Sequence, residues 1–494
     1  MPSRGVVAAG HPLSAEAGAR VLREGGNAVD AAVASMLTSF TAEPLLTGPG
    51  AGGYLLVAGP GVEPVLLDFF VAAPGQGGGD APRAALLPVH VSFGDAEQVF
   101  NVGPASIGAW GMPAGLATAI DRWGTVPLAD LCAPAAAHAR AGVPLNAPQG
   151  YVSEILEAIL VSTPEAAALF APGGRALREG DVFAFPELGD AIERLGAEGA
   201  EPFYTGEIAR RVLAWLADRG AVLTAQDLAD YGAIAREPVR VAYRGREIAT
   251  NPPPSAGGAL IALALATLER DDRAGAPGPA RLVEVMEAVQ ARRTPAFVEG
   301  LDRPGFAEEL LATQLGSTTH VSVLDGDGLA CAITATNGEG SGIVVPGTGM
   351  HPNNMMGEED LNPLGFHAFP PGRRMPSMMA PTVVRGDRGV ELVLGSAGSN
   401  RIRSAILQTV IGVVDRGLDA QEAVVAPRLH FEDDTVYAEP GIDLDALRAA
   451  GRTVAPFRAR NLFFGGVQAV QHDPDSGRTT AGGDPRRGGA AVHA

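Results

Sequence analysis

Lysine is absent from this chain, and all 37 of its basic residues are arginine. A catalytic lysine is therefore excluded, and with it Schiff-base and pyridoxal chemistry and the lysine of a phosphate-binding loop. Acidic residues number 56, which gives a net charge of −19. This charge argues against a nucleic-acid partner, because phosphate binding depends on cationic side chains.

Cysteine is nearly absent as well. Cys132 and Cys331 are the only two, so a disulfide framework is excluded, and no cysteine pair has metal-ligand spacing. The nine histidines are scattered without the paired spacing of a zinc site. We therefore expect neither a metal nor a cofactor. The G-x-S-x-G elbow of many serine hydrolases is missing too.

Long apolar runs are also lacking. The longest, GGALIALALATL at residues 257–268, is too short to cross a bilayer. The first residues, MPSRGVVAAGHPLSAEAGAR, lack the apolar core of a secretory signal. The sequence therefore predicts a cytoplasmic protein with no membrane partner.

The residues that are present indicate a globular chain. Apolar residues make up 46% and charged residues 19%, and no linker interrupts the 494 positions, so one compact domain is expected. Residues 13–42 predict two helices separated by Gly25-Gly26-Asn27. Residues 389–417 predict a strand, a glycine turn and a helix. Antiparallel strands with helices outside them favour a layered α+β or α/β domain.

Two glycine-rich motifs have simple structural explanations. Residues 48–53 satisfy G-x-G-x-x-G, but the order is helix, glycines, strand, whereas a dinucleotide site requires strand, glycines, helix. The DGDG at 325–328 lies between the predicted strands 318–324 and 329–335, so it is expected to be a hairpin turn rather than a calcium loop.

A pair of threonines opens the first strand of that hairpin, in the sequence TTHVSV from Thr318. Threonine favours strands, which is one explanation. The other is that the chain is cut before Thr318, so that a hydroxyl nucleophile and a free α-amine share one residue. The local sequence leaves both open. The same holds for the turn at 395–400, which is either a plain connector or a set of N–H groups for an oxyanion.

Ten segments together resemble the γ-glutamyltranspeptidase family of N-terminal-nucleophile (Ntn) hydrolases, and they follow the family order along nearly the whole chain. They are GGNAVDAA (25–32), residues 111–142, LTAQDLADY (223–231), NPPPSAGG (251–258), TTHVSV (318–323), PGTGMHPNN (346–354), PSMMAPTVV (376–384), GSAGSNRIRSAILQ (395–408), EAVVAPRLH (422–430) and DPRRGG (484–489). The resemblance implies an α+β fold, the Ntn-hydrolase αββα sandwich of stacked, mainly antiparallel sheets between helical layers.

The resemblance also implies self-processing. The bond between Ser317 and Thr318 would be cleaved autocatalytically, giving a large subunit, 1–317, and a small subunit, 318–494, which together form one compact domain. Thr318 would then be the nucleophile. Its freed α-amine, with a pKa of about 7.7–8.0, would serve as the base.

Three further catalytic residues are carried over from the family. Thr336 would lie beside Thr318 and orient it. Gly398 and Ser399 would supply oxyanion-hole N–H groups worth about 3 kcal/mol each. Relatives usually have two glycines at this last pair, so Ser399 is a departure that keeps the backbone N–H.

The substrate side departs much further from the family pattern. Relatives bind the glutamyl α-carboxylate with an arginine and a pair of serines; the corresponding residues are Phe70 and Ser377-Met378. The segment that holds the α-amino group becomes NNMMGE at residues 353–358, and the loop after Thr336 is shorter. The candidate substrate-binding residues are Phe70, Asn337, Met355, Glu358, Ser377 and Met378.

Losing the arginine should weaken a glutamyl donor about ten- to a hundredfold or more, because a hydrogen bond to a charged group is worth roughly 1.5–3 kcal/mol. We therefore expect a self-processing hydrolase or acyltransferase that cleaves a small amide, with altered recognition of the glutamyl carboxylate. The alternatives are a conventional γ-glutamyltransferase or glutathione hydrolase, a carbon–carbon bond hydrolase of a biosynthetic pathway, and an unprocessed binding protein.

Overall fold

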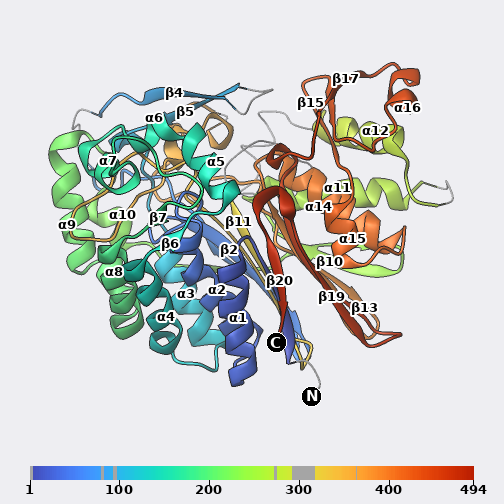
Figure 1. Cartoon of the computed structure of the whole chain (residues 1–494), viewed down its shortest axis with the longest axis horizontal. Coiled ribbons are helices and arrows are strands. Elements are labelled where there is room, and N and C mark those ends of the chain that lie inside the picture. Colours follow the sequence, from blue (N-terminus) through green and yellow to red (C-terminus); the bar gives the residue numbers. More distant parts are fainter. Residues whose placement is uncertain (1–3, 79–82, 93–96, 272–274, 292–317, 363) are drawn as a thin grey trace.

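Two antiparallel sheets lie face to face, and helices cover the outer side of each (Figure 1). The computed structural model describes residues 4–78, 83–92, 97–271, 275–291, 318–362 and 364–494. This arrangement confirms the predicted αββα sandwich. It also confirms the hairpin, the paired N-terminal helices and the strand–turn–helix segment.

The first sheet has seven strands, all antiparallel to their neighbours. In spatial order they are β20 (Ala490–His493), β1 (Gly5–Ala9), β11 (Thr319–Asp325), β12 (Ala330–Thr336), β2 (Gly52–Gly59), β3 (Val62–Phe69) and β8 (Ile234–Arg236). The hairpin β11–β12 therefore lies at the centre of this sheet, where both strands have buried neighbours. That position explains why all seven residues of β12 are buried.

The second sheet has six strands, also antiparallel. In spatial order they are β19 (Arg478–Gly483), β18 (Gly466–Asp473), β14 (Gly389–Ala397), β13 (Thr382–Gly386), β10 (Arg246–Thr250) and β9 (Val239–Tyr243). Strand β14 contacts both β11 and β12 across the sandwich. Its last residue, Ala397, leads directly into the turn predicted to form the oxyanion hole.

The helical layer over the first sheet begins with the two predicted helices. The layer contains α1 (Pro12–Glu24), α2 (Ala28–Ala42), α3 (Met112–Trp123), α4 (Leu128–Ala141) and α8 (Pro186–Glu198). Helix α1 ends because Gly25 adopts the left-handed conformation, with φ 103°. Helix α2 begins at Asn27, whose side chain accepts hydrogen bonds from the backbone N–H groups of Val29 and Asp30.

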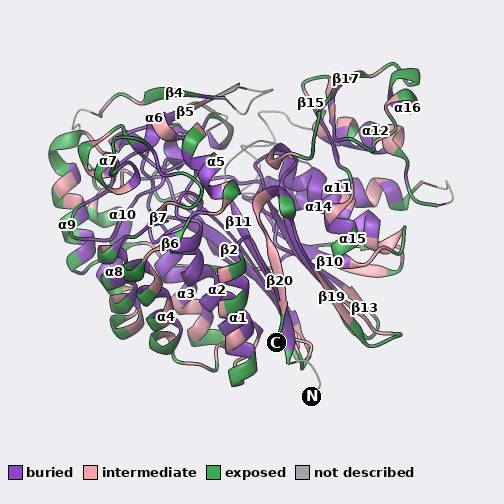
Figure 2. Ribbon diagram, viewed as in Figure 1, coloured by how far each residue is buried: buried purple, intermediate pink, exposed green. Residues whose placement is uncertain are grey.

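The layer over the second sheet includes a helix that is apolar on all sides. The layer contains α11 (Ala256–Glu269), α12 (Pro279–Gln290), α14 (Arg401–Val414) and α15 (Ala420–Val425). Helix α11 carries the longest apolar run of the sequence and lies against β9, α12 and α14, which accounts for a helix without a polar face. Figure 2 shows the buried strands between helices whose outward sides are exposed.

Shorter elements complete the chain outside the two layers. They are helices α5 (Ala147–Ile155), α6 (Glu157–Leu160), α7 (Pro164–Phe170), α9 (Glu207–Leu216), α10 (Ala225–Ala229) and α16 (Leu444–Ala449), and strands β4 (Leu87–Ser92), β5 (Glu97–Val102), β6 (Val143–Pro144), β7 (Val182–Phe183), β15 (Leu429–Glu432), β16 (Thr435–Ala438) and β17 (Thr453–Pro456). Within the described residues, no helix is both long and apolar enough to cross a membrane.

Candidate active site

The hairpin register brings the two predicted catalytic threonines together. Thr319, the first residue of β11, pairs with Ala335, so Thr318 and Thr336 occupy neighbouring positions at the open end of the hairpin. Both are buried, and both line one small pocket. The hydroxyl of Thr336 accepts a hydrogen bond of 2.9 Å from the backbone N–H of Gly338, which fixes its orientation. Ser317, on the other side of the predicted cleavage bond, lies outside the described residues.

The pocket beside Thr318 is small and mostly apolar. Its volume is about 10 Å³, about what a single water requires. The lining residues are Phe70, Thr318, Thr336, Leu361, Ser377, Met378, Met379 and Ile402. Three of the six predicted substrate-binding residues, Phe70, Ser377 and Met378, therefore lie at the predicted nucleophile.

Phe70, which the family resemblance matches to an arginine, belongs to the core between the sheets. It is fully buried, and its ring stacks on Tyr54 with 5.5 Å between centroids. The nearby carboxylate of Asp68 accepts a hydrogen bond from the Phe70 N–H and pairs with Arg236 at 2.7 Å. Arg374 also approaches Asp68, at 3.5 Å, and lies over the ring of Tyr231. These arginines are thus held by Asp68 and do not line the pocket.

Ser377 and Met378 are held against the start of α11. The backbone carbonyl of Ser377 accepts hydrogen bonds from Ser255 Oγ, at 2.9 Å, and from the N–H of Ala256, at 2.8 Å. Its hydroxyl accepts from the N–H of Met379 at 3.0 Å. The Ser377 hydroxyl therefore has a structural partner, while the Met378 side chain fills the pocket wall.

Gly398 and Ser399 form the turn between β14 and α14. Both have positive φ, 112° and 66°. A Cβ on Gly398 would lie 2.5 Å from Gly465 Cα, so no other residue fits there without movement. Ser399 holds the left-handed conformation at a cost of about 1 kcal/mol. The turn places the N-terminus of α14 beside the pocket that Ile402 lines, and the N–H groups of Arg401 and Ile402 donate to the carbonyls of Gly398 and Ser399.

A buried network that the sequence analysis missed holds this turn from behind. The side-chain amide of Asn400 donates to the carboxylate of Glu432. His430 lies 3.5 Å from that carboxylate and 2.7 Å from the hydroxyl of Ser404. Burial lowers the pKa of His430 to about 4, so the ring is neutral at neutral pH. His430 ends the segment EAVVAPRLH (422–430), one of the ten that carry the family resemblance, so its position is marked in the sequence although its contact with Glu432 is not.

Of the remaining substrate-binding candidates, Asn337 and Glu358 lie beside Gly338, and Met355 lies in the core. A side chain on Gly338 would collide with Asn354 and Glu358, so these buried residues pack against the loop after Thr336. The side-chain amide of Asn337 donates to the carbonyl of His351 at 3.1 Å. Met355 is buried in the core between the sheets. None of Asn337, Met355 and Glu358 lines the Thr318 pocket.

Glu43 is a second residue that sequence reasoning missed. It follows α2, and its Oε1 accepts a hydrogen bond of 2.9 Å from the hydroxyl of Thr319. Burial raises its pKa to about 7, against the opposing effects of Thr319 and Arg487. A carboxyl group that titrates near neutrality therefore contacts the residue next to the predicted nucleophile. It is separated from Thr319 by about 280 positions in sequence, and no local pattern marks it.

His320, the third residue of the TTH motif, has a structural role. Its ring nitrogens contact Thr334 Oγ1 at 2.7 Å and Ser322 Oγ at 2.8 Å. Burial lowers its pKa to about 3, so the ring is neutral. A Cβ on Gly395 would collide with this ring, which shows that His320 fills the space under β14.

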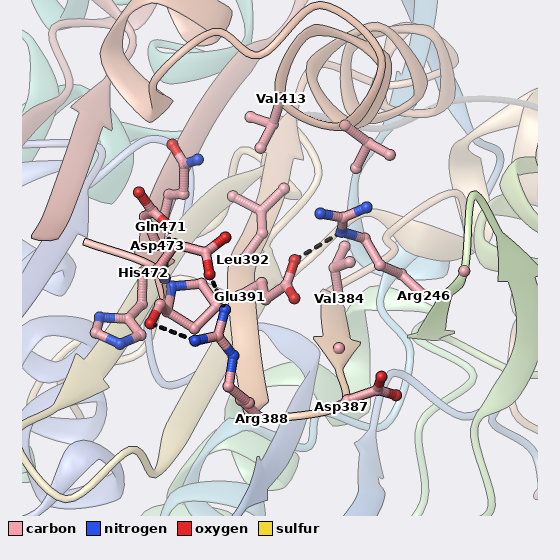
Figure 3. Close-up of a pocket in the computed structure, with 15 residues that line it drawn as sticks. Arg246, Val384, Asp387, Arg388, Glu391, Leu392, Val413, Gln471, His472 and Asp473 are labelled. Carbon is pink, nitrogen blue, oxygen red and sulfur yellow. Dashed lines mark hydrogen bonds and ion pairs between the residues drawn. The ribbon is translucent and has the colours of Figure 1, made fainter. Parts of the chain in front are cut away.

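A larger cavity of about 310 Å³ lies at the other end of β14, near the β13–β14 turn (Figure 3). Two ion pairs lie in its wall: Arg246 with Glu391 at 2.6 Å, and Arg388 with Asp475 at 2.5 Å. It contains none of the predicted catalytic residues. Over the described part of the chain, no cluster of three or more His, Cys, Asp or Glu is arranged to hold a metal ion.

Comparison with known proteins gives matches over nearly the whole chain. Acylase ACY 1 proenzyme of Pseudomonas sp. (strain V22) is 32% identical over 518 residues, which covers 97% of this chain and 92% of the relative. Glutathione hydrolase proenzyme of Escherichia coli (strain K12) is 31% identical over 539 residues, with 98% and 90% covered. The crystal structure of cephalosporin acylase from Bacillus halodurans is similar, with a TM-score of 0.84 at 26% identity and 99% and 96% covered.

The family comparison agrees with the order of motifs and with the sandwich fold. A family model described as gamma-glutamyltranspeptidase matches residues 14–494. The relatives named above are enzymes, and the structural neighbour shares the fold. This chain therefore belongs to the γ-glutamyltranspeptidase family of Ntn-hydrolase enzymes.

Proposed function

We propose that this chain cleaves itself before Thr318 and then hydrolyses, or transfers the acyl group of, a small amide with an apolar acyl half. The observation that carries the proposal is the apolar wall, with Phe70 and Met378, of the pocket that Thr318 and Thr336 share; because its volume is about 10 Å³, an acyl chain must displace these side chains to enter. A glutamyl head group carries two charges, and burying them against these side chains without partners would cost several kcal/mol.

The first step uses Thr318 on its own chain. The hydroxyl oxygen attacks the carbonyl carbon of Ser317, and the peptide nitrogen takes up a proton as it leaves. The departure of this nitrogen frees the α-amine of Thr318; water then hydrolyses the resulting ester, which releases the carboxylate of Ser317 and restores the hydroxyl of Thr318. The buried position of Thr318 next to Thr336 supports this step, because a positioned hydroxyl has little freedom to lose.

The second step repeats this chemistry on a substrate. The α-amine accepts the hydroxyl proton, the oxygen attacks the amide carbonyl, and the proton passes to the departing amine. Positioned base catalysis is worth roughly 10²–10⁴-fold. The N–H groups at Gly398 and Ser399 stabilise the oxyanion, and water or a second amine then accepts the acyl group from the threonine ester. The names of the relatives, an acylase and a glutathione hydrolase, fit this class of reaction.

A second candidate is a conventional γ-glutamyltransferase with a rearranged site. The buried carboxylate of Glu358 lies against Gly338, in the loop that follows Thr336. A carboxylate there would suit the ammonium group of a glutamyl donor. Among the residues that the structure describes, no arginine lines the pocket to bind the donor carboxylate, so we rank this function second.

Two measurements test the proposal. The denatured wild-type protein should give two masses that split before Thr318, and Thr318→Ala should give one full-length mass. The processed enzyme should hydrolyse butyryl-4-nitroanilide with at least tenfold higher kcat/KM than γ-glutamyl-4-nitroanilide. A single full-length mass in the wild type contradicts self-cleavage, and a preference for the γ-glutamyl substrate favours the second candidate.

A further inference from the structure

One arginine beside the oxyanion turn lacks the partners that such a side chain normally has. Arg487 ends the short turn Pro485–Arg487 between β19 and β20. Its stem crosses Gly466, where a Cβ would lie 2.6 Å from Arg487 Cδ. Its guanidinium reaches the oxyanion turn, because a Cβ on Gly398 would lie 3.4 Å from Arg487 Nη2. The close approach to Gly466 fixes the direction of the side chain.

The guanidinium of Arg487 makes a single weak hydrogen bond within the described chain. Nη2 donates to the carbonyl of Leu462 at 3.4 Å, and the buried Nε has no partner. The adjacent Arg486 differs, since it pairs with Glu439 and Asp484 and donates to two carbonyls. An arginine has five N–H donors, so most of those on Arg487 remain available for a ligand.

The charges around Arg487 come from the segments that meet at Thr318. Burial and Arg401 lower the pKa of Arg487 to about 10, while Asp484, Glu339 and Glu43 oppose this shift. The side chain is therefore cationic at neutral pH. Glu43 binds Thr319, and Glu339 follows Thr336 by three residues. No acidic side chain that the structure describes lies within ion-pair distance of the Arg487 guanidinium.

We propose that Arg487 binds a carboxylate on the amine half of the substrate. The inference rests on the proposed function, in which the acyl half occupies the apolar pocket and the carbonyl oxygen lies at Gly398. Arg487 is not part of the lining of that pocket, yet it contacts the Gly398 turn. The group it reaches is therefore on the amine half. A guanidinium fork binds a carboxylate through two parallel hydrogen bonds, which a neutral amide cannot match.

The test compares two substrates that differ only in this group, N-butyryl-4-aminobenzoate and N-butyryl-4-aminobenzamide. We expect the wild type to prefer the carboxylate by roughly 10- to 100-fold in kcat/KM, as hydrogen bonds to a charged group predict. Arg487→Met should abolish this preference and leave the kcat/KM for the carboxamide within about threefold. Arg487→Lys should restore part of the preference, because it keeps the charge without the planar fork.

The control is Arg388→Met, which removes the same side chain from the cavity at the far end of β14. This variant should leave the kcat/KM for both substrates unchanged. If Arg487→Met cleaves itself normally but loses kcat/KM equally on both substrates, the inference is overturned. Such a result would mean that Arg487 supports the Gly398 turn and does not bind the carboxylate. A wild type that shows no preference would overturn it as well.

A binding measurement separates this inference from the proposed function. Calorimetry of the processed wild type with 4-aminobenzoate and 4-aminobenzamide requires no turnover. If no butyryl amide is hydrolysed, the proposed function fails. Tighter binding of 4-aminobenzoate that disappears in Arg487→Met would still support the carboxylate site, and equal binding of both ligands would reject it.

Discussion

Glu43 shows how one buried residue links the active site to pH. Burial raises its pKa to about 7, whereas an ordinary glutamate titrates near 4.3. Between these values the folded chain holds a proton that the unfolded chain has lost. The stability that depends on Glu43 is therefore fully present below about pH 4.5 and is lost as the pH rises to about 7.

Glu43→Gln should remove this pH dependence. From pH 4.5 to 7, the free energy of unfolding of the parent should fall by roughly 3 kcal/mol relative to the variant, which is the linkage value for a shift of this size. Urea unfolding at both pH values measures it, with both proteins carrying Thr318→Ala so that the chain stays intact. Parallel pH profiles of the two proteins would show that Glu43 titrates normally.

Met378 is expected to set the length of acyl chain that the enzyme accepts. Met378→Ala enlarges the pocket beside Thr318 and should favour hexanoyl over butyryl 4-nitroanilide, by roughly fourfold for each methylene that fills the new space. Met286→Ala, in the same core but outside this pocket, is the matched control. The measurement is the ratio of kcat/KM for the hexanoyl substrate to that for the butyryl substrate. An equal ratio in the two variants would contradict the proposal that the acyl chain binds in the Thr318 pocket.

At the scale of elements, the strand–turn–helix segment β14–α14 carries the Gly398–Ser399 turn that we propose as the oxyanion site. The effect of the close contact between Gly398 and Gly465 can be measured separately from that of positive φ. Gly398→Ala should cost several kcal/mol and stop self-cleavage, because its Cβ would collide with Gly465. Gly417→Ala also has positive φ, 65°, but meets no neighbour, so it should cost only about 1 kcal/mol. Thermal unfolding and denaturing mass measurement compare the two; similar effects would mean that the contact with Gly465 is unimportant.

The sequence predicted the elements well where their signals are local. Gly25 and Asn27 mark a helix end and a helix start, and the alternation after Thr318 marks a central hairpin. The site was predicted less completely. Glu43, Glu432 and Arg487 reach the active region through contacts that depend on the packing of distant segments, and nothing in their immediate neighbours indicates those contacts.

The candidate residues that the family resemblance supplied fall into two groups, those that line the Thr318 pocket and those that do not. One pocket brings together five of them, because the register of the β11–β12 hairpin and the order of the strands place them there: Thr318, Thr336, Phe70, Ser377 and Met378. Asn337 and Glu358 lie beside Gly338 instead, in and against the loop after Thr336, and Met355 lies in the core between the sheets. The roles of these residues are predictions, and the substitutions at Thr318 and Met378 test two of them.

At the scale of the whole molecule, the order of strands has a consequence for how the protein can be produced. In the first sheet, β1 lies between β11 and β20, and β12 pairs with β2; in the second, β10 pairs with β13. A chain ending at residue 317 and a chain starting at 318 would divide both sheets: in the first sheet β1 of one piece lies between strands of the other, and in the second sheet β9 and β10 are separated from the remaining four strands. Neither has a complete hydrogen-bonded surface to fold against.

The two pieces should therefore behave as a split protein. Expressed separately, 1–317 and 318–494 should be insoluble, and expressed together they should assemble and co-purify in a one-to-one ratio. Activity in the co-expressed pair would show that a threonine exposed by ordinary removal of an initiator methionine can replace self-cleavage. Soluble, folded behaviour of either piece alone would contradict the interleaved architecture, and the assembled pair would allow each half to be mutated, labelled or exchanged independently.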